Sequence, residues 1–245
     1  MRLGTTNSLT VLRFRFLAFA AFGIALAVAG FFPTYFRPLL IDNASFASIY
    51  HVHGLFGAAW LILFLCQTLF VQNGRLALHR SAGILGIGVV LGVMITLPWV
   101  AYEEVSNQLQ GDQGATDFVL GPVLDALTFG VLTGVGFMKR KDPNAHKRWM
   151  LLATVLLLWV AWVRLRYYFP AFPHNFNVFS FGLGMAPIPV FWLLDRMTTG
   201  AVHPVLLWGG IGLLLEQGLQ LLFFGTQGWS ALAHAVYQAL THLLA

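Results

Sequence analysis

Between residues 82 and 101 the chain reads AGILGIGVVLGVMITLPWVA, with no ionisable side chain in the stretch. An α-helix needs about 20 apolar residues to cross a hydrocarbon core roughly 30 Å thick, and this stretch provides them. Six other stretches have a similar length and apolar character, and they lie at 11–31, 52–72, 119–138, 148–168, 177–195 and 204–224. None of them alternates polar and apolar residues, which argues against a β-barrel. The sequence therefore predicts an all-α, polytopic membrane bundle with seven transmembrane helices.

The composition of the 245-residue chain supports this fold class. Hydrophobic residues make up 58% of it and its mean hydropathy is +0.75, whereas the apolar share of soluble domains is about 45–50%. The loops between the predicted spans are too short for a second folded unit, so we expect a single transmembrane domain over residues 1–245. Residues 228–244 follow the last span and place polar side chains on one helical face only, which is typical of an interfacial helix.

The first span has one feature of a secretory signal peptide. Arg13 and Arg15 precede an apolar run that ends in AVA at residues 27–29, a pattern typical of a cleavage site. The run is longer than such segments usually are, and residues 31–33 continue its apolar character. These features favour a helix that is retained in the membrane.

Basic residues are concentrated in alternate loops. Three arginines lie at or near the N-terminus, Arg75 and Arg80 follow the second span, and residues 139–148 form the most basic loop. The loop after the third span is acidic and contains Glu103 and Glu104. The positive-inside rule then predicts a bacterial inner-membrane protein with a cytoplasmic N-terminus and a periplasmic C-terminus. The net charge of +5 reflects this topology, and we expect no nucleic-acid partner.

Five ionisable residues interrupt the spans or their edges, and they are His53, Asp125, Arg164, Arg166 and Glu216. A charge within a bilayer costs at least about 2.5–3.5 kcal/mol, so such groups usually face the interior of a bundle. All five fall in the outer half of the predicted bundle, and we expect the two carboxylates to lie within salt-bridge or single-water reach of an arginine. Asp125, Glu216 and Arg164 are therefore candidate catalytic residues. An ion pair that only holds helices together is the alternative interpretation.

Three histidines lie at the start of predicted spans on the cytoplasmic side, at positions 79, 146 and 203 (His79, His146 and His203). Contact with lipid phosphates is one interpretation of these positions. A second is that imidazoles from two helices hold a haem iron, while nearby basic residues meet the propionates. A metal site made of three histidines is a third possibility, and His51, His53 and His203 are its candidate ligands. We place His53 on the inward face of its helix and His51 closer to the membrane surface.

Three motifs resemble an uncharacterised family of bacterial inner-membrane proteins: HVHG at 51–54, GRLALHRSAG at 74–83, and HKRWM at 146–150 with a later Arg164. They cover the second to fifth spans, about half of the chain. The arrangement is also similar to that of four-helix membrane cytochromes of the b561 and ferric-reductase type, which carry haem b between helices. This resemblance implies haem b as a cofactor, with His53, His79 and His146 as cofactor-binding residues. Those cytochromes pair histidines on both sides, whereas His53 has no clear partner here, so one haem or none is implied.

Three classes of function fit these observations. The first is a redox protein that binds haem b and exchanges electrons with a quinone. The second is an enzyme that acts on an apolar lipid or isoprenoid substrate, with Asp125 or Glu216 as acid or base. The third is a transporter, sensor or accessory subunit. The expected partners are the lipid bilayer and a quinone or another apolar small molecule, and the sequence leaves open whether the protein is an enzyme.

Overall fold

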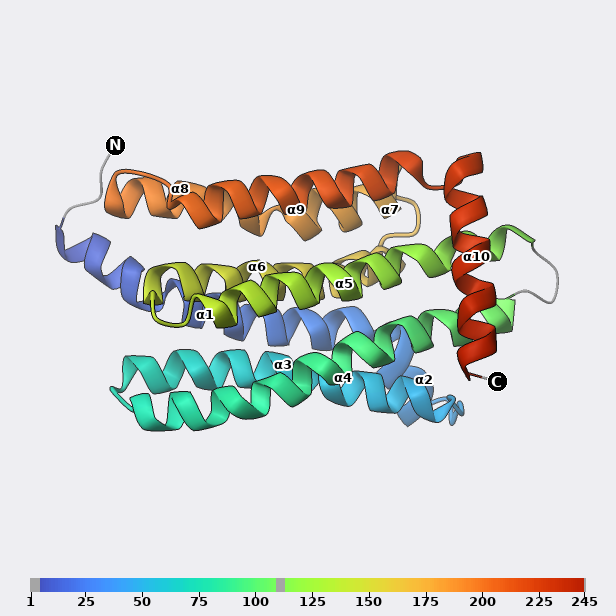
Figure 1. Cartoon of the computed structure of the whole chain (residues 1–245), viewed down its shortest axis with the longest axis horizontal. Coiled ribbons are helices and arrows are strands. Elements are labelled where there is room, and N and C mark those ends of the chain that lie inside the picture. Colours follow the sequence, from blue (N-terminus) through green and yellow to red (C-terminus); the bar gives the residue numbers. More distant parts are fainter. Residues whose placement is uncertain (1–4, 109–112, 245) are drawn as a thin grey trace.

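The computed structural model describes residues 5–108 and 113–244, and this part of the chain contains helices and no β-strand. The longer helices are α1 (Thr5–Phe31), α3 (Ser48–Gln72), α4 (Leu76–Gln108), α5 (Asp117–Met138), α6 (Pro143–Arg164), α8 (Pro187–Thr199), α9 (Pro204–Phe223) and α10 (Gln227–Leu244). The shorter elements are a π-helical turn at Phe32–Phe36, α2 (Arg37–Leu40), 3₁₀ turns at Gln113–Thr116 and Leu165–Tyr168, α7 (Asn175–Asn177) and a π-helical turn at Val178–Leu183. Figure 1 shows the long helices side by side, with α10 across one end.

Within the described residues, seven helical segments are long and apolar enough to cross a membrane, which confirms the predicted fold class. The helices follow the predicted spans closely, with two differences. Helix α4 runs seven residues past the predicted end at 101, because Val105 is buried at 1% exposure against α10. The sixth span is two helical pieces, and its second piece begins at Pro187. A proline there lacks the N–H that a continuous helix would need, so it starts a new helix instead.

The two ends of the bundle differ in charge. We call the end formed by the α3–α4, α5–α6 and α8–α9 connections the basic end, since it carries Arg75, Lys139, Arg140 and Lys141. We call the other end the α10 end. Asp142 caps α6 at the basic end, where its carboxylate accepts hydrogen bonds from the backbone N–H groups of the first helical turn. These hydrogen bonds lower the pKa of Asp142.

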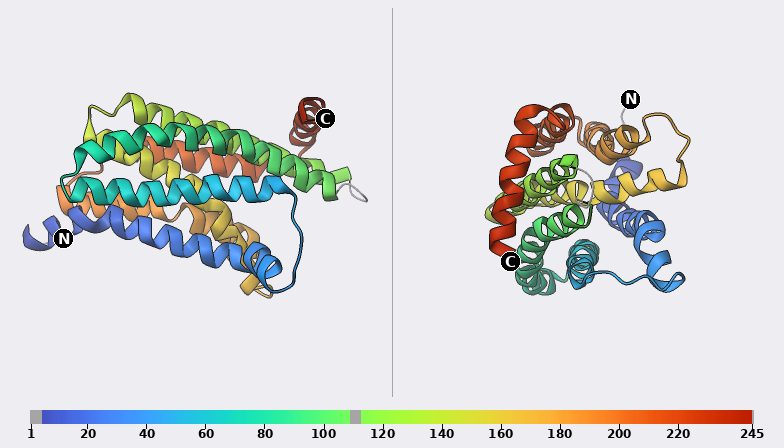
Figure 2. Two further views of the ribbon diagram at one scale, coloured as in Figure 1. Left: turned by 90° about the horizontal axis from the view of Figure 1, so that it is seen from below. Right: turned by 90° about the vertical axis from the view of Figure 1, so that its right-hand side faces the viewer.

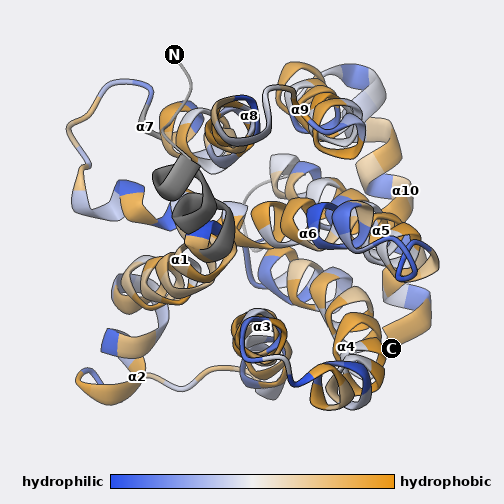
Figure 3. Ribbon diagram, turned by 90° about the vertical axis from the view of Figure 1, so that its left-hand side faces the viewer, coloured by the Kyte–Doolittle hydropathy of each residue, from blue (hydrophilic) through white to orange (hydrophobic). Residues whose placement is uncertain are grey.

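Helix α6 lies at the centre of the bundle. It packs against α1, α5 and α9, and Leu151, Leu152 and Ala153 in its first half are fully buried. Figure 3 looks along the bundle and shows α6 surrounded by the other long helices. Outward positions of the peripheral helices are apolar as well; Ile84 and Leu85 of α4 are 68% and 72% exposed. Apolar residues on both faces of a helix are what a lipid environment requires.

Helix α10 lies across the ends of α4 and α5, as the second view in Figure 2 also shows. The Trp229 indole N–H donates to the backbone carbonyl of Asp117 over 2.9 Å, and the Ser230 hydroxyl donates to the Asp117 carboxylate over 3.0 Å. Trp229 and Ala233 are buried against α4 and α5. The helix matches the predicted segment 228–244, and its apolar face is turned to the bundle.

The predicted orientation in the membrane can be tested by cysteine labelling, because the structure separates the marker positions. Lys141 lies at the basic end, whereas Glu104 and His242 lie at the α10 end. In a Cys66→Ala background, an impermeant maleimide should label Glu104→Cys and His242→Cys in intact cells and should label Lys141→Cys only after lysis. Labelling of position 141 in intact cells would contradict a cytoplasmic N-terminus.

Candidate functional site

Two carboxyl groups meet between α5 and α9. Asp125 comes from α5 and Glu216 from α9, and two amide side chains of α9 bridge them. Gln217 Nε2 donates to Asp125 Oδ1 over 2.7 Å and to Glu216 Oε2 over 2.8 Å. Gln220 Nε2 donates to Asp125 Oδ1 over 2.9 Å and to Glu216 Oε1 over 2.6 Å. Residues 216 and 220 are one helical turn apart, so they share the face of α9 that is turned towards α5. We call these four residues the carboxyl–amide cluster.

Arg164 and Arg166 lie away from this cluster, and the expected salt bridge to a carboxylate is not found. Arg164 donates to the Val160 carbonyl over 3.3 Å, and its guanidinium group stacks 4.4 Å from the centre of the Phe31 ring. Arg166 donates to the Val163 carbonyl over 3.0 Å. Neither guanidinium forms an ion pair within the described residues. The reason is rotation: Arg164 faces α1, whereas the cluster lies between α5 and α9.

His53 lies apart from the carboxylates as well. Its Nδ1 is 2.9 Å from the Thr96 hydroxyl, so His53 is turned towards α4. The exposed His51 contacts the hydroxyl of Tyr35 instead. The five polar residues expected to form one site are therefore divided, with the carboxylates between α5 and α9 and His53 on the other side of the bundle.

His79 of α4 and His146 of α6 are brought together at the basic end. Their ring centroids are 6.2 Å apart and their ring planes are perpendicular, at 88°. His146 Nδ1 is 2.8 Å from the backbone carbonyl of Gly136. A Cβ atom at Gly136 would lie 2.1 Å from Met150 Cε, so the Met150 side chain packs directly on this glycine. Nδ1 of His79 is buried and has no hydrogen-bond partner in the described part of the chain.

His203 does not join these two histidines in a metal site. It caps α9, and its Nδ1 accepts the backbone N–H of Val205 over 3.2 Å. Burial, together with the nearby Arg148, lowers the pKa of His203. Residues 5–108 and 113–244 contain no group of three His, Cys, Asp or Glu side chains placed to hold a metal ion. The predicted three-histidine site, with His51, His53 and His203 as ligands, is therefore not found.

A buried charge cluster near the basic end is not predicted from the sequence. Asp195 of α8 is fully buried, and Arg148 of α6 donates to both of its carboxylate oxygens over 2.8–3.1 Å. Arg15 of α1 lies 2.7 Å from the same carboxylate, and the backbone N–H of His203 donates to it over 3.1 Å. In the sequence, both arginines fit the positive-inside rule as residues that orient the helices. Asp195 is the one sign of the cluster in the sequence, because it is an acidic residue at a boundary that is otherwise basic.

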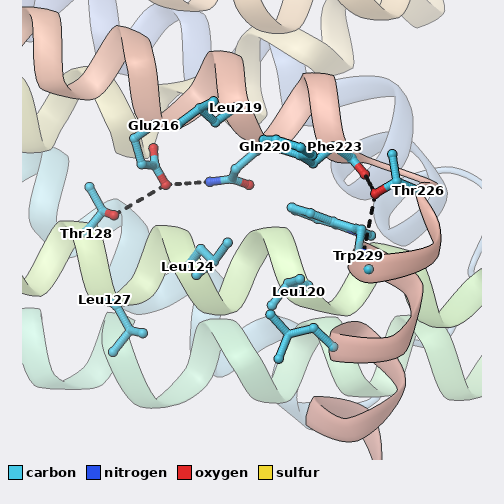
Figure 4. Close-up of a pocket in the computed structure, with 12 residues that line it drawn as sticks. Leu120, Leu124, Leu127, Thr128, Glu216, Leu219, Gln220, Phe223, Thr226 and Trp229 are labelled. Atoms are coloured by element: carbon cyan, nitrogen blue, oxygen red, sulfur yellow. Dashed lines mark hydrogen bonds between the residues drawn. The ribbon is translucent and has the colours of Figure 1, made fainter.

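Two grooves flank the carboxyl–amide cluster. The first has a volume of about 490 Å³ and extends past Leu124 and Phe223 towards Trp229 of α10. Figure 4 shows Glu216 and Gln220 on its wall among leucine side chains. The second has a volume of about 420 Å³ and extends towards Trp208. Both are lined by α5 and α9, and Glu216 lines both of them.

No protein-family model matches the chain, and no curated protein or solved structure matches it either. The motif resemblance to an uncharacterised inner-membrane family and the similarity of the arrangement to membrane cytochromes therefore remain predictions from the sequence. The function is best argued from the side chains that the fold brings together.

Proposed function

We propose that this chain is a redox protein of the bacterial inner membrane that holds a haem b between His79 and His146. One observation carries the proposal, namely the 6.2 Å separation and perpendicular arrangement of the two imidazole rings. These two imidazoles, which come from different helices, would hold the haem iron through one nitrogen of each ring.

The surroundings of the two rings support the same role. A metal-binding histidine usually donates its other ring N–H to a carbonyl or carboxylate group, which fixes the ring and its tautomer. His146 Nδ1 and the Gly136 carbonyl have this relation, and the arrangement leaves Nε2 of His146 available. The unpaired Nδ1 of His79 is costly in a buried position, and binding of the ring to a metal would help to offset that cost.

A basic residue next to the histidine pair suits the carboxylates of a haem, since Arg80 follows His79 directly and is exposed. Lys147 follows His146 but is turned to α1, where its Nζ lies 5.8 Å from the centre of the Phe16 ring. When bound, a haem b supplies reversible one-electron transfer. The protein side chains hold and orient the group, and the apolar outer faces of the helices give a membrane quinone access to the bundle. A quinone is therefore the proposed electron partner.

An absorbance spectrum tests this proposal directly. Protein purified from haem-replete cells should show a Soret band, and dithionite should sharpen the α band. A pyridine haemochrome assay should give one haem b per chain. A decyl-chain quinol should reduce the haem, because the proposed electron partner is a quinone. A colourless preparation from haem-replete cells would reject the haem proposal.

The carboxyl–amide cluster supports a second candidate function, an enzyme that acts on an apolar lipid or isoprenoid substrate. The observation that favours it is the position of Glu216 on the walls of both grooves. A carboxyl group in an apolar site can hold or release a proton near neutral pH. In this role Glu216 would exchange a proton with the substrate, while Gln217 and Gln220 would position the carboxyl groups.

A further inference from the structure

We propose that the space between α5 and α9 is a lateral binding site for an amphiphile with one long apolar chain and a headgroup that donates hydrogen bonds. The proposal is independent of the haem and names the ligand class of the carboxyl–amide cluster. It rests on the shape of the grooves, on the balance of donors and acceptors in the cluster, and on the route by which a molecule can enter.

The shape follows from the way the helices pack. Helix α9 packs on α6 and α8, whereas α5 packs on α4, α6 and α10. The two grooves lie between α5 and α9, and both reach Glu216. Their volumes, about 490 and 420 Å³, are each within the range of about 300–1,000 Å³ typical of small-molecule sites. Apart from Thr128, Glu216, Gln220 and Thr226, the first groove is lined by apolar residues and one glycine, which suits a hydrocarbon chain.

The cluster has more hydrogen-bond acceptors than donors. The amide groups of Gln217 and Gln220 direct all four of their N–H bonds at Asp125 and Glu216. Thr128 adds one weak donor to Glu216, at 3.4 Å. In the described part of the chain no Lys, Arg or His forms an ion pair with either carboxylate, and no donor reaches either amide oxygen.

Part of this surplus faces the grooves, because Glu216 lines both of them and Gln220 lines the first. Gln217 is 5% exposed, so its unpaired amide oxygen is nearly enclosed. Figure 4 shows the Gln220 amide with its nitrogen towards Glu216 and its oxygen turned away from Glu216, and this oxygen lies beside Gly121 of α5, where an added Cβ would be 3.1 Å from it. Carboxylate and amide oxygens accept hydrogen bonds and donate none. A headgroup that carries hydroxyl donors complements this wall, whereas an anionic headgroup would be repelled.

The entry route is from the side. Helix α10 closes the first groove at the α10 end, where Trp229 and Leu232 form part of its wall. Along the length of the bundle Leu127 and Leu219 flank the groove and are 56% and 49% exposed. In a membrane these side chains face lipid, so a ligand reaches the cluster from the bilayer. This route selects a molecule with an apolar chain, either isoprenoid or acyl, that ends in a hydroxyl-bearing head.

Photolabelling of the purified full chain in detergent tests the site. The probe is hexadecanol with a diazirine on its chain, and the comparison probe is its methyl ether, which has the same chain and no donor. The alcohol should label groove residues such as Leu124 and Leu219, and the ether should label them roughly tenfold less, because a hydrogen bond to a charged group contributes about that much affinity. Glu216→Gln removes the negative charge and replaces one of the two acceptor oxygens with an NH2 donor, so it should reduce labelling by the alcohol towards the level of the ether.

A pair of glycine variants distinguishes a blocked groove from a general loss of folding. Gly228 lines the first groove and Gly88 lies on α4 away from both grooves, and an added Cβ meets no atom within 4 Å at either position. Gly228→Phe should abolish labelling by the alcohol near the cluster, and Gly88→Phe should leave it unchanged. Competition by unlabelled farnesol points to an isoprenoid chain and competition by monooleoylglycerol to an acyl chain, and either result supports the site.

Two results would overturn the inference. One is equal labelling of the groove by the alcohol and the ether. The other is labelling by the alcohol that neither Glu216→Gln nor Gly228→Phe reduces in protein that still folds. His146→Ala should leave labelling unchanged, so failure of the haem proposal and failure of this one are distinguishable.

Discussion

Replacement of Asp195 with alanine is expected to destabilise the folded bundle by about 3–5 kcal/mol, the usual cost of breaking a buried ion pair by removing one partner. Asp195 is fully buried and receives two guanidinium groups, from Arg15 and Arg148. Without it, both arginines keep their charge in a site that excludes water. Asp195→Asn should fall between the wild type and Asp195→Ala, because an amide oxygen still accepts a hydrogen bond but carries no charge.

Thermal unfolding of the detergent-purified protein measures this effect. Asp42→Ala is the matched control, because Asp42 and Arg37 form an ion pair of 3.9 Å in which both side chains are more than half exposed. Exposed pairs contribute about 0–1 kcal/mol, so this variant should unfold close to the wild type. Equal melting temperatures for Asp195→Ala and Asp42→Ala would show that the buried cluster adds nothing to stability.

His79→Ala and His146→Ala are each expected to abolish the absorbance of the proposed haem. Both rings are needed in the proposed site, because each would supply one of the two nitrogens that hold the iron, and the ring centroids are 6.2 Å apart. His203→Ala is the control at the same end of the bundle. Its ring caps α9 and lies in no pair of facing histidines, so the spectrum should persist. The protein should remain folded in all three variants, since none of the three rings takes part in the Asp195 ion pairs.

The measurement is the ratio of the Soret band to the protein absorbance in each purified variant. Redox titration of His203→Ala should give the wild-type midpoint potential. A Soret band that persists in both His79→Ala and His146→Ala would refute this ligand pair. Loss of the band in His203→Ala alone, with the protein folded, would indicate that the haem ligand lies in the α8–α9 connection and not at His79 and His146.

The sequence predicted the helices well, because about 20 apolar residues and flanking charges are a strong and local signal. It also predicted that Asp125 and Glu216 approach each other, and the two lie at similar depth on α5 and α9. What the sequence could not supply was the rotation of each helix about its axis. Arg164 was expected beside the carboxylates and faces Phe31 instead. A shift of one residue turns a side chain by about 100°, and no local pattern in a uniformly apolar helix fixes that angle.

The charge cluster near the basic end was missed for a related reason. Arg148 and Arg15 lie where the positive-inside rule expects basic residues, so their presence there needed no further explanation. Only the three-dimensional arrangement shows that both turn inwards to Asp195. Burial, and not charge alone, separates a residue that orients a helix from one that holds helices together.

The Arg15–Asp195–Arg148 contact also sets an order for biogenesis. Its members belong to the first, fifth and sixth membrane-crossing segments, and they are separated by more than a hundred residues at the widest. A ribosome delivers the two arginines to the membrane well before it delivers the aspartate that neutralises them. Until Asp195 emerges, the two guanidinium groups lack the carboxylate that they contact in the folded bundle. Arrival of α8 then completes the charge balance and allows the helices to close.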